Sequence, residues 1–155
     1  MKNRSCCFTG HRVIPDGDKS VLCRRLIESI EMLASEGITE FYSGGAIGFD
    51  MLAAEAVLFM KNKYPQLRLH IIVPCENQDV KWSEENKSRY RKIKDSADEV
   101  RCLSPVYFNG CMQVRNRFMV DNSSVCIAYL TKMSGGTAGT VKYAQQKELR
   151  CIILP

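Results

Sequence analysis

The sequence lacks the features that mark membrane, secreted or zinc-binding proteins. No uninterrupted apolar run approaches the ~18 residues that a membrane helix needs. The apolar stretch behind the basic start stops at Gly10, which is too short for a signal peptide. Only His11 and His70 are histidines, and the eight cysteines form no C-x-x-C pair, which disfavours a zinc site. We therefore expect a cytoplasmic protein with reduced cysteines, no metal, no cofactor and no membrane partner.

The composition is that of an ordinary globular domain. With 45% hydrophobic residues, 25% charged residues and five prolines, the chain does not resemble a disordered or collagen-like protein. A length of 155 residues suits one domain, expected to span residues 1–155. The 22 basic and 17 acidic residues give a net charge of +5, which favours anionic partners in general. A small phosphorylated ligand and single-stranded DNA are both compatible with this charge. The sequence also leaves open whether the protein forms a homodimer.

Strand and helix patterns alternate along the chain. Nearly continuous apolar strands that are separated by helices are typical of a parallel sheet covered on both faces. Ser83, followed by two acidic residues, predicts the start of a helix, and Gly37 predicts the end of another. We therefore predict an α/β fold, a three-layer Rossmann-like sandwich with a mostly parallel sheet. The expected strands cover residues 5–9, 40–42, 67–73, 99–103, 125–130 and 151–154.

Glycine-rich turns gather at the predicted carboxyl ends of the strands. Gly10-His11-Arg12 follows the first strand, Gly44-Gly45 the second, and Gly135-Gly136-Thr137 the fifth. Ligands of parallel sheets bind at this edge, and a Gly-Gly pair before a helix lets backbone N–H groups approach an anion. Each pair would equally serve a simple tight turn. Two pairs at one edge favour a ligand with at least one phosphate.

Charged residues near the same edge have two interpretations each. Arg115 and Asn116 precede the fifth strand, and a guanidinium group suits phosphate, although a solvated helix face is the alternative. Asp50 lies in the first turn of the second helix, where it can cap the helix or contact a ligand. His11 lies in a glycine-bounded loop, where a ligand contact and a purely structural role are the two alternatives, whereas His70 is mid-strand and predicted to be structural.

The usual nucleotide-binding fingerprints do not fit. Ser43 stands where the pattern G-x-G-x-x-G needs its first glycine. Asp18 interrupts a P-loop-like spacing by separating Gly17 from Lys19. The sequence therefore predicts neither a dinucleotide-dependent dehydrogenase nor an NTPase.

Several motifs, taken in order along essentially the whole chain, resemble the YpsA-like family of the SLOG superfamily. These motifs are Thr9-Gly10-His11-Arg12, Ser43-Gly44-Gly45-Ala46-x-Gly48-x-Asp50, Pro74…Gln78…Trp82, Arg115-Asn116-Arg117-Phe118-Met119-Val120-Asp121 and Gly135-Gly136-Thr137-x-x-Thr140. The resemblance implies a Rossmann-like domain that binds a nucleotide-derived ligand.

Two related families suggest different functions. Arg115 and Gly135-Gly136-Thr137 are similar to residues of the LOG phosphoribohydrolases, which cleave a base from nucleoside monophosphates with an Arg and a Glu. Residues 141–143 (Val-Lys-Tyr) occupy the stretch where that Glu is expected, so enzymatic activity stays undecided. Residues 43–58 and 115–155 are similar to the Rossmann domain of the DNA-processing protein DprA, which implies single-stranded DNA binding as a further alternative.

The sequence thus predicts a domain that binds a nucleotide or a nucleotide-derived ligand at the carboxyl edge of its sheet, as a sensor or regulatory module. A phosphoribohydrolase and a single-stranded DNA-binding protein are the alternatives. The expected ligand-binding residues are Gly10, His11, Arg12, Gly44, Gly45, Asp50, Arg115, Asn116, Gly135, Gly136 and Thr137.

Overall fold

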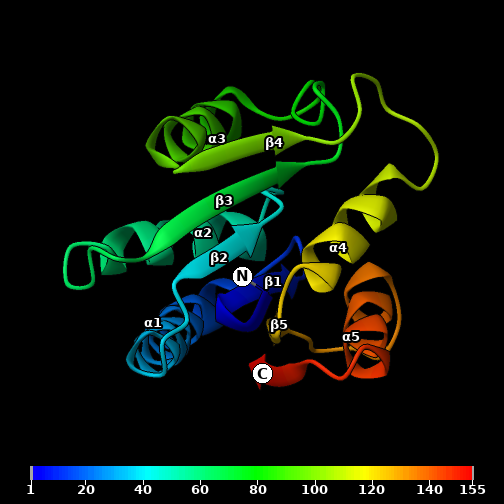
Figure 1. Cartoon of the computed structure of the whole chain (residues 1–155). Helices are drawn as coiled ribbons and strands as arrows, with labels where there is room; N and C mark the ends of the chain where they lie inside the picture. The colour runs from blue at the N-terminus through cyan, green and yellow to red at the C-terminus, as the bar shows by residue number, and fades with distance from the viewer. Residues whose placement is uncertain (1, 155) are drawn as a thin grey trace.

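A six-stranded, wholly parallel sheet forms the centre of the protein, as a computed structural model that describes residues 2–154 shows (Figure 1). Every pair of neighbouring strands is parallel, in the order β4-β3-β2-β1-β5-β6. The strands are β1 (Ser5–Gly10), β2 (Glu40–Ser43), β3 (Arg68–Val73), β4 (Glu99–Cys102), β5 (Val125–Tyr129) and β6 (Arg150–Leu154). This arrangement confirms the predicted α/β Rossmann-like fold.

Five α-helices connect the strands. They are α1 (Lys19–Ser35), α2 (Phe49–Met60), α3 (Glu84–Ser96), α4 (Cys111–Asp121) and α5 (Gly136–Gln146), and two short 3-10 turns lie at Lys2–Arg4 and Asp16–Asp18. The local sequence explains two of the helix ends. The Ser83 hydroxyl caps α3 by accepting a hydrogen bond from the backbone N–H of Asn86, and Gly37 (φ +93°) follows α1 in the left-handed conformation that glycine adopts at little cost. Within residues 2–154, no helix is both long and apolar enough to cross a membrane.

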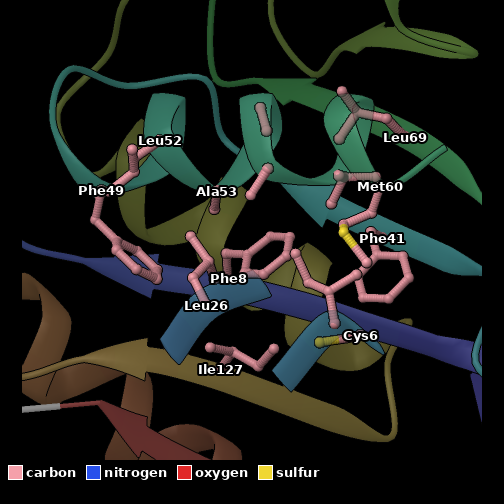
Figure 2. Close-up of a cluster of buried hydrophobic side chains, with 14 of the residues drawn as sticks. Cys6, Phe8, Leu26, Phe41, Phe49, Leu52, Ala53, Met60, Leu69 and Ile127 are labelled. Carbon is pink, nitrogen blue, oxygen red and sulfur yellow. The ribbon is translucent and has the colours of Figure 1, made fainter. Parts of the chain in front are cut away.

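The hydrophobic core is split by the sheet into two layers. Helices α1, α2 and α3 cover one face, where Phe8 and Phe41 stack at 5.9 Å between their ring centroids and Leu26 and Ala53 pack beside them (Figure 2). Helices α4 and α5 cover the other face, over a cluster that includes Cys126. Because the central strands are buried on both faces, their sequences are apolar at nearly every position.

The strand order locates the point where the chain reverses direction across the sheet. From β1 the chain adds β2, β3 and β4 on one side, and it then returns to place β5 on the other side of β1 (Figure 1). The loops that leave β1 and β5 therefore turn to opposite faces, which opens a crevice at the carboxyl ends of these two strands. In open α/β sheets this reversal point is the usual place for a ligand.

A polar network lies on the sheet away from that crevice. The ring of His70, in β3, stands 2.7 Å from Glu99 Oε1 through Nδ1 and 2.9 Å from Glu40 Oε1 through Nε2, and it stacks on Tyr42 at 4.6 Å. Burial raises the pKa of Glu99, but its hydrogen bond with His70 and the nearby charge of Arg101 outweigh burial and lower that pKa overall. This network accounts for His70 as a structural residue.

Candidate functional site

A cavity of about 320 Å³ opens at the reversal point, between the carboxyl ends of β1 and β5. Its volume falls within the range of about 300–1,000 Å³ that small-molecule sites occupy. Four segments of the chain supply its lining, namely Thr9, Gly10, His11 and Arg12 after β1, Ala46 and Asp50 around the start of α2, Met112, Arg115 and Asn116 on α4, and Lys132, Ser134, Gly135, Gly136 and Thr137 after β5.

Arg115 forms the inner wall of this cavity, and only 4% of it is exposed. Its Nη1 donates hydrogen bonds to the carbonyl oxygens of Gly44 (2.8 Å) and Ile72 (3.3 Å), and its Nε donates to Asn116 Oδ1 (2.8 Å). Its Nη2, by contrast, meets only the sulfur of Met112, at 3.6 Å, within the part of the chain that the structure describes. Arg115 is therefore anchored through Nη1 and Nε, while Nη2 retains donor capacity.

Asp50 is the only carboxylate in the cavity lining, as far as residues 2–154 are concerned. It is the second residue of α2 and only 7% exposed. Burial raises its pKa, and the positive charge of Arg115 opposes that shift most strongly. Burial lowers the pKa of Arg115, and Asp50 in turn opposes that shift. The two groups thus stabilise each other's charge inside the protein.

The start of α5 offers unpaired backbone donors to the cavity. Gly135, at the N-cap position with φ +94°, has no side chain to cap the helix, and no acidic residue lies in its first turn. The first N–H groups of a helix have no partner within it, so those at Gly136 and Thr137 are free for an anion. The Thr137 side chain is 8% exposed, and its hydroxyl finds no hydrogen-bond partner within residues 2–154.

A hydrogen-bonded chain fixes α4 against α5. Asn116 Nδ2 donates to the Thr140 hydroxyl (3.2 Å), which itself donates to the carbonyl oxygen of Gly136 (2.9 Å). Since Asn116 Oδ1 also accepts from Arg115, the guanidinium group and the start of α5 are held in one network. This network fixes the position of the Arg115 guanidinium group relative to the start of α5.

The loop after β1 is held over the cavity by its own contacts. The His11 carbonyl accepts from the Phe49 N–H (3.1 Å), and the His11 Nε2 accepts from the Thr131 N–H (3.0 Å). Partial burial, together with the charge of Lys132, lowers the pKa of His11, which favours the neutral ring that this acceptor role requires. The Arg12 side chain is exposed and makes no ion pair within the described chain. His11 therefore ties the loops after β1 and β5 together, and Arg12 remains available to a ligand.

The glycines of the first two turns serve packing. A β-carbon at Gly10 would overlap the ring of Phe49, and one at Gly44 would overlap the guanidinium group of Arg115. The N–H of Gly45 donates to the hydroxyl of Ser43 (3.2 Å), so it is already paired. Gly44 and Gly45 are buried and do not line this cavity, so of the two glycine turns singled out in the sequence only Gly135-Gly136 lines it. The close approach of Arg115 to the backbone explains this difference.

Nine of the eleven expected site residues nevertheless line the one cavity, and Gly44 and Gly45 are the exceptions. The sequence-based interpretation did not include Lys132, Ser134 and Met112 among the site residues. Lys132 and Ser134 follow β5 at the same edge as the Gly135-Gly136 turn, and this position was a usable signal. Met112 lies one helical turn before Arg115, a spacing that places both on one face of α4. Within residues 2–154, no cluster of three or more His, Cys, Asp or Glu side chains could hold a metal ion.

The fold is similar to that of two solved bacterial proteins. DNA processing protein A from Helicobacter pylori, described for its single-stranded DNA binding mode, matches with a TM-score of 0.71 and 20% identity, over 99% of this chain and 66% of that one. DprA from Streptococcus pneumoniae matches with a TM-score of 0.71 and 19% identity, over 99% of this chain and 51% of that one. The chain thus spans between half and two-thirds of these proteins, and at such identities the likeness concerns the fold.

Sequence comparison points to a narrower group. A UPF0398 protein of Brevibacillus brevis is 32% identical over 132 residues, which are 83% of this chain and 68% of the relative. The uncharacterized prophage-derived protein YoqJ of Bacillus subtilis is 30% identical over 131 residues, 77% of each chain. The model of the YpsA family, described as a SLOG family, matches residues 15–151. That match begins after β1 and contains all five α-helices, strands β2 to β5 and most of the cavity lining, and the chain belongs to the YpsA family of SLOG proteins.

Proposed function

We propose that this protein binds a nucleotide or nucleotide-derived ligand and holds a phosphate group of that ligand in the cavity between β1 and β5. One observation carries the proposal, namely the surplus of positive charge in the lining. Within residues 2–154 the lining holds three cationic side chains, Arg12, Arg115 and Lys132, and one carboxylate, Asp50. A phosphate would supply the negative charge that this arrangement lacks.

The donors around the cavity suit the shape of a phosphate. The start of α5 and Thr137 bring backbone N–H groups and a hydroxyl to the lining, and Arg115 brings a guanidinium group whose Nη2 meets only the sulfur of Met112 within residues 2–154. A phosphate oxygen accepts several hydrogen bonds at once, and a helix N-terminus adds a favourable dipole. Binding would therefore satisfy donors that have no other acceptor.

The lining supports binding better than hydrolysis. Glycosidic cleavage needs a carboxyl group near the sugar, and Asp50 is the sole candidate in the lining within residues 2–154. Its position beside Arg115, deep in the cavity, suits charge balance. We therefore propose a sensor or regulatory module, without phosphoribohydrolase activity.

Titration calorimetry with nucleotides tests the proposal through two substitutions. Thr137→Val removes a hydroxyl that supports nothing else in the structure, and Lys132→Ala removes an exposed cation. Each should weaken the binding of adenosine 5′-monophosphate by about 5- to 20-fold, since a hydrogen bond to a charged group contributes about 1.5 kcal/mol. Lys132→Ala should leave the melting temperature within ~2 °C, because a surface substitution usually stays within ~0.5 kcal/mol. Thr137→Val should do the same, because valine has nearly the shape of threonine and the hydroxyl that it replaces has no partner within residues 2–154.

Lys142→Ala is the matched control, because Lys142 is an exposed lysine on α5 that does not line the cavity. It removes the same charge from the same region and should leave the affinity unchanged. Equal losses in Lys132→Ala and Lys142→Ala would show that general charge, and not this cavity, attracts the ligand.

Single-stranded DNA binding is the second candidate, favoured by the fold shared with the two DprA proteins. Salt dependence separates the two functions. A site for one phosphate releases few counterions, whereas a groove that contacts several phosphates loses affinity steeply, with log K falling by ~0.7 per phosphate for each decade of salt. A slope steeper than about −3 for an oligonucleotide that outcompetes mononucleotides would favour DNA.

A further inference from the structure

A second cavity lies next to the proposed phosphate site. It has a volume of about 600 Å³ and shares two lining residues, Arg12 and Met112, with the first. The loop after β3 and the loop that connects β4 to α4 form its other walls, and Figure 1 shows the latter as the long yellow-green segment leading to α4. Arg12 and Met112 thus line both cavities, which places the two cavities next to each other.

Two aromatic side chains that are not fully buried in the core, Trp82 and Tyr107, line the second cavity. Tyr107 is 60% exposed, although tyrosine side chains in proteins are usually at least partly buried. Trp82 also lines it and packs edge-on against the buried Tyr90, with ring centroids 5.0 Å apart. Met112 adds a polarisable thioether, which makes favourable contacts with aromatic rings. This lining suits a flat, aromatic group.

Two amide side chains line this cavity, and one of them has unused hydrogen-bonding capacity. The amide of Gln78 is fully engaged, because it donates to the Gly44 carbonyl and the Tyr90 hydroxyl and accepts from Arg115. The side-chain amide of Asn77, in contrast, makes no hydrogen bond within residues 2–154 and is exposed. An asparagine offers both donors and an acceptor, which is what the edge of a nucleobase requires.

We propose that the second cavity binds the base of the nucleotide whose phosphate occupies the first, with Tyr107 as its stacking platform and Asn77 at its edge. This assignment rests on the proposed function. It requires a ligand with an anionic end and a heteroaromatic end, joined by a sugar that passes Arg12 and Met112.

The test compares ligands with and without a base. Ribose 5-phosphate and the four nucleoside monophosphates (AMP, GMP, CMP and UMP) are titrated by calorimetry, with the fluorescence of Trp82, the single tryptophan, as a second readout. Stacking of a base on an aromatic side chain corresponds to about 5- to 150-fold in affinity. At least one nucleotide should bind more than about tenfold tighter than ribose 5-phosphate and change the Trp82 fluorescence.

Tyr107→Ala should remove that advantage, with a loss of about 5- to 50-fold for the nucleotide and less than about twofold for ribose 5-phosphate. Phe108→Ala is the matched control, because Phe108 is the neighbouring, 43% exposed aromatic residue and does not line the cavity. It should leave both affinities unchanged.

Three outcomes would overturn the base assignment. If all four nucleotides bind within threefold of ribose 5-phosphate, the phosphate site stands and the base site does not. If a nucleoside diphosphate depends on Lys81, another lining residue, and not on Tyr107, the second cavity holds a second phosphate. If no phosphorylated compound binds at all, the proposed function fails and this inference fails with it.

Discussion

Replacing Arg115 tests whether this residue is a ligand contact alone or part of the protein core. If Arg115 is a ligand contact, as its sequence motif suggests, Arg115→Ala should weaken the binding of an anionic ligand and leave the thermal stability nearly unchanged. The structure leads to the opposite expectation for stability, because the guanidinium group is 4% exposed and donates hydrogen bonds to the ends of β2 and β3.

The expected magnitude follows from what the alanine would leave behind. The Asp50 carboxylate, already buried, would lose the positive charge that most strongly opposes its desolvation. Removing one member of a buried, hydrogen-bonded charged network costs about 3–5 kcal/mol. For a domain of this size each kcal/mol shifts the melting temperature by about 2–4 °C, so Arg115→Ala should melt about 6–20 °C below the wild type.

Urea unfolding of a double-mutant cycle isolates the charge interaction. Arg115→Ala should cost less in an Asp50→Asn background than in the wild type, with a coupling free energy of about 0.5–3 kcal/mol. Arg117→Ala is the control, since Arg117 is exposed on the same helix and lies over the ring of Tyr143. It should stay within about 1 kcal/mol. A cost below ~1 kcal/mol for Arg115→Ala, or zero coupling, would refute the buried-network interpretation.

Three further predictions concern packing, pH dependence and catalysis. Gly10→Ala should lower the free energy of unfolding in urea by about 1–3 kcal/mol, because the new methyl group overlaps the Phe49 ring. Gly139→Ala, which adds a methyl group in open space on α5, should raise it by up to ~1 kcal/mol, and equal effects would contradict this difference. Glu99→Gln should lower the free energy of unfolding by less than about 1 kcal/mol at pH 7. This loss should vanish as the pH falls below the ordinary carboxyl pKa of 4.5 and through the lower pKa of the folded state, because a depressed pKa stabilises the fold only while the group is ionised. A loss that persists at pH 3 would point to packing. The purified protein should release no adenine from AMP by chromatographic assay, and turnover that Asp50→Asn abolishes would make this an enzyme.

Local sequence determined the elements of this fold and the edge that carries the site. Apolar runs that alternate with helical spacing specify parallel strands covered on both faces, and the family resemblance rests on motifs that stand after the strands. The Ser83 cap and the Gly37 helix end are local interactions between residues a few positions apart, so they are readable without the tertiary structure.

The tertiary structure alone decided how the site residues divide their work. The order of strands places β5 beside β1, and only that placement brings Lys132 and Arg12 to one cavity. Arg115 reaches carbonyl groups 71 and 43 residues away, a distance over which sequence spacing carries no information about contact. The guanidinium group of Arg115 occupies the space beside Gly44, where the sequence had suggested a phosphate. The sequence could not distinguish the two cases, because a glycine beside an anion and a glycine beside a guanidinium group look the same in sequence.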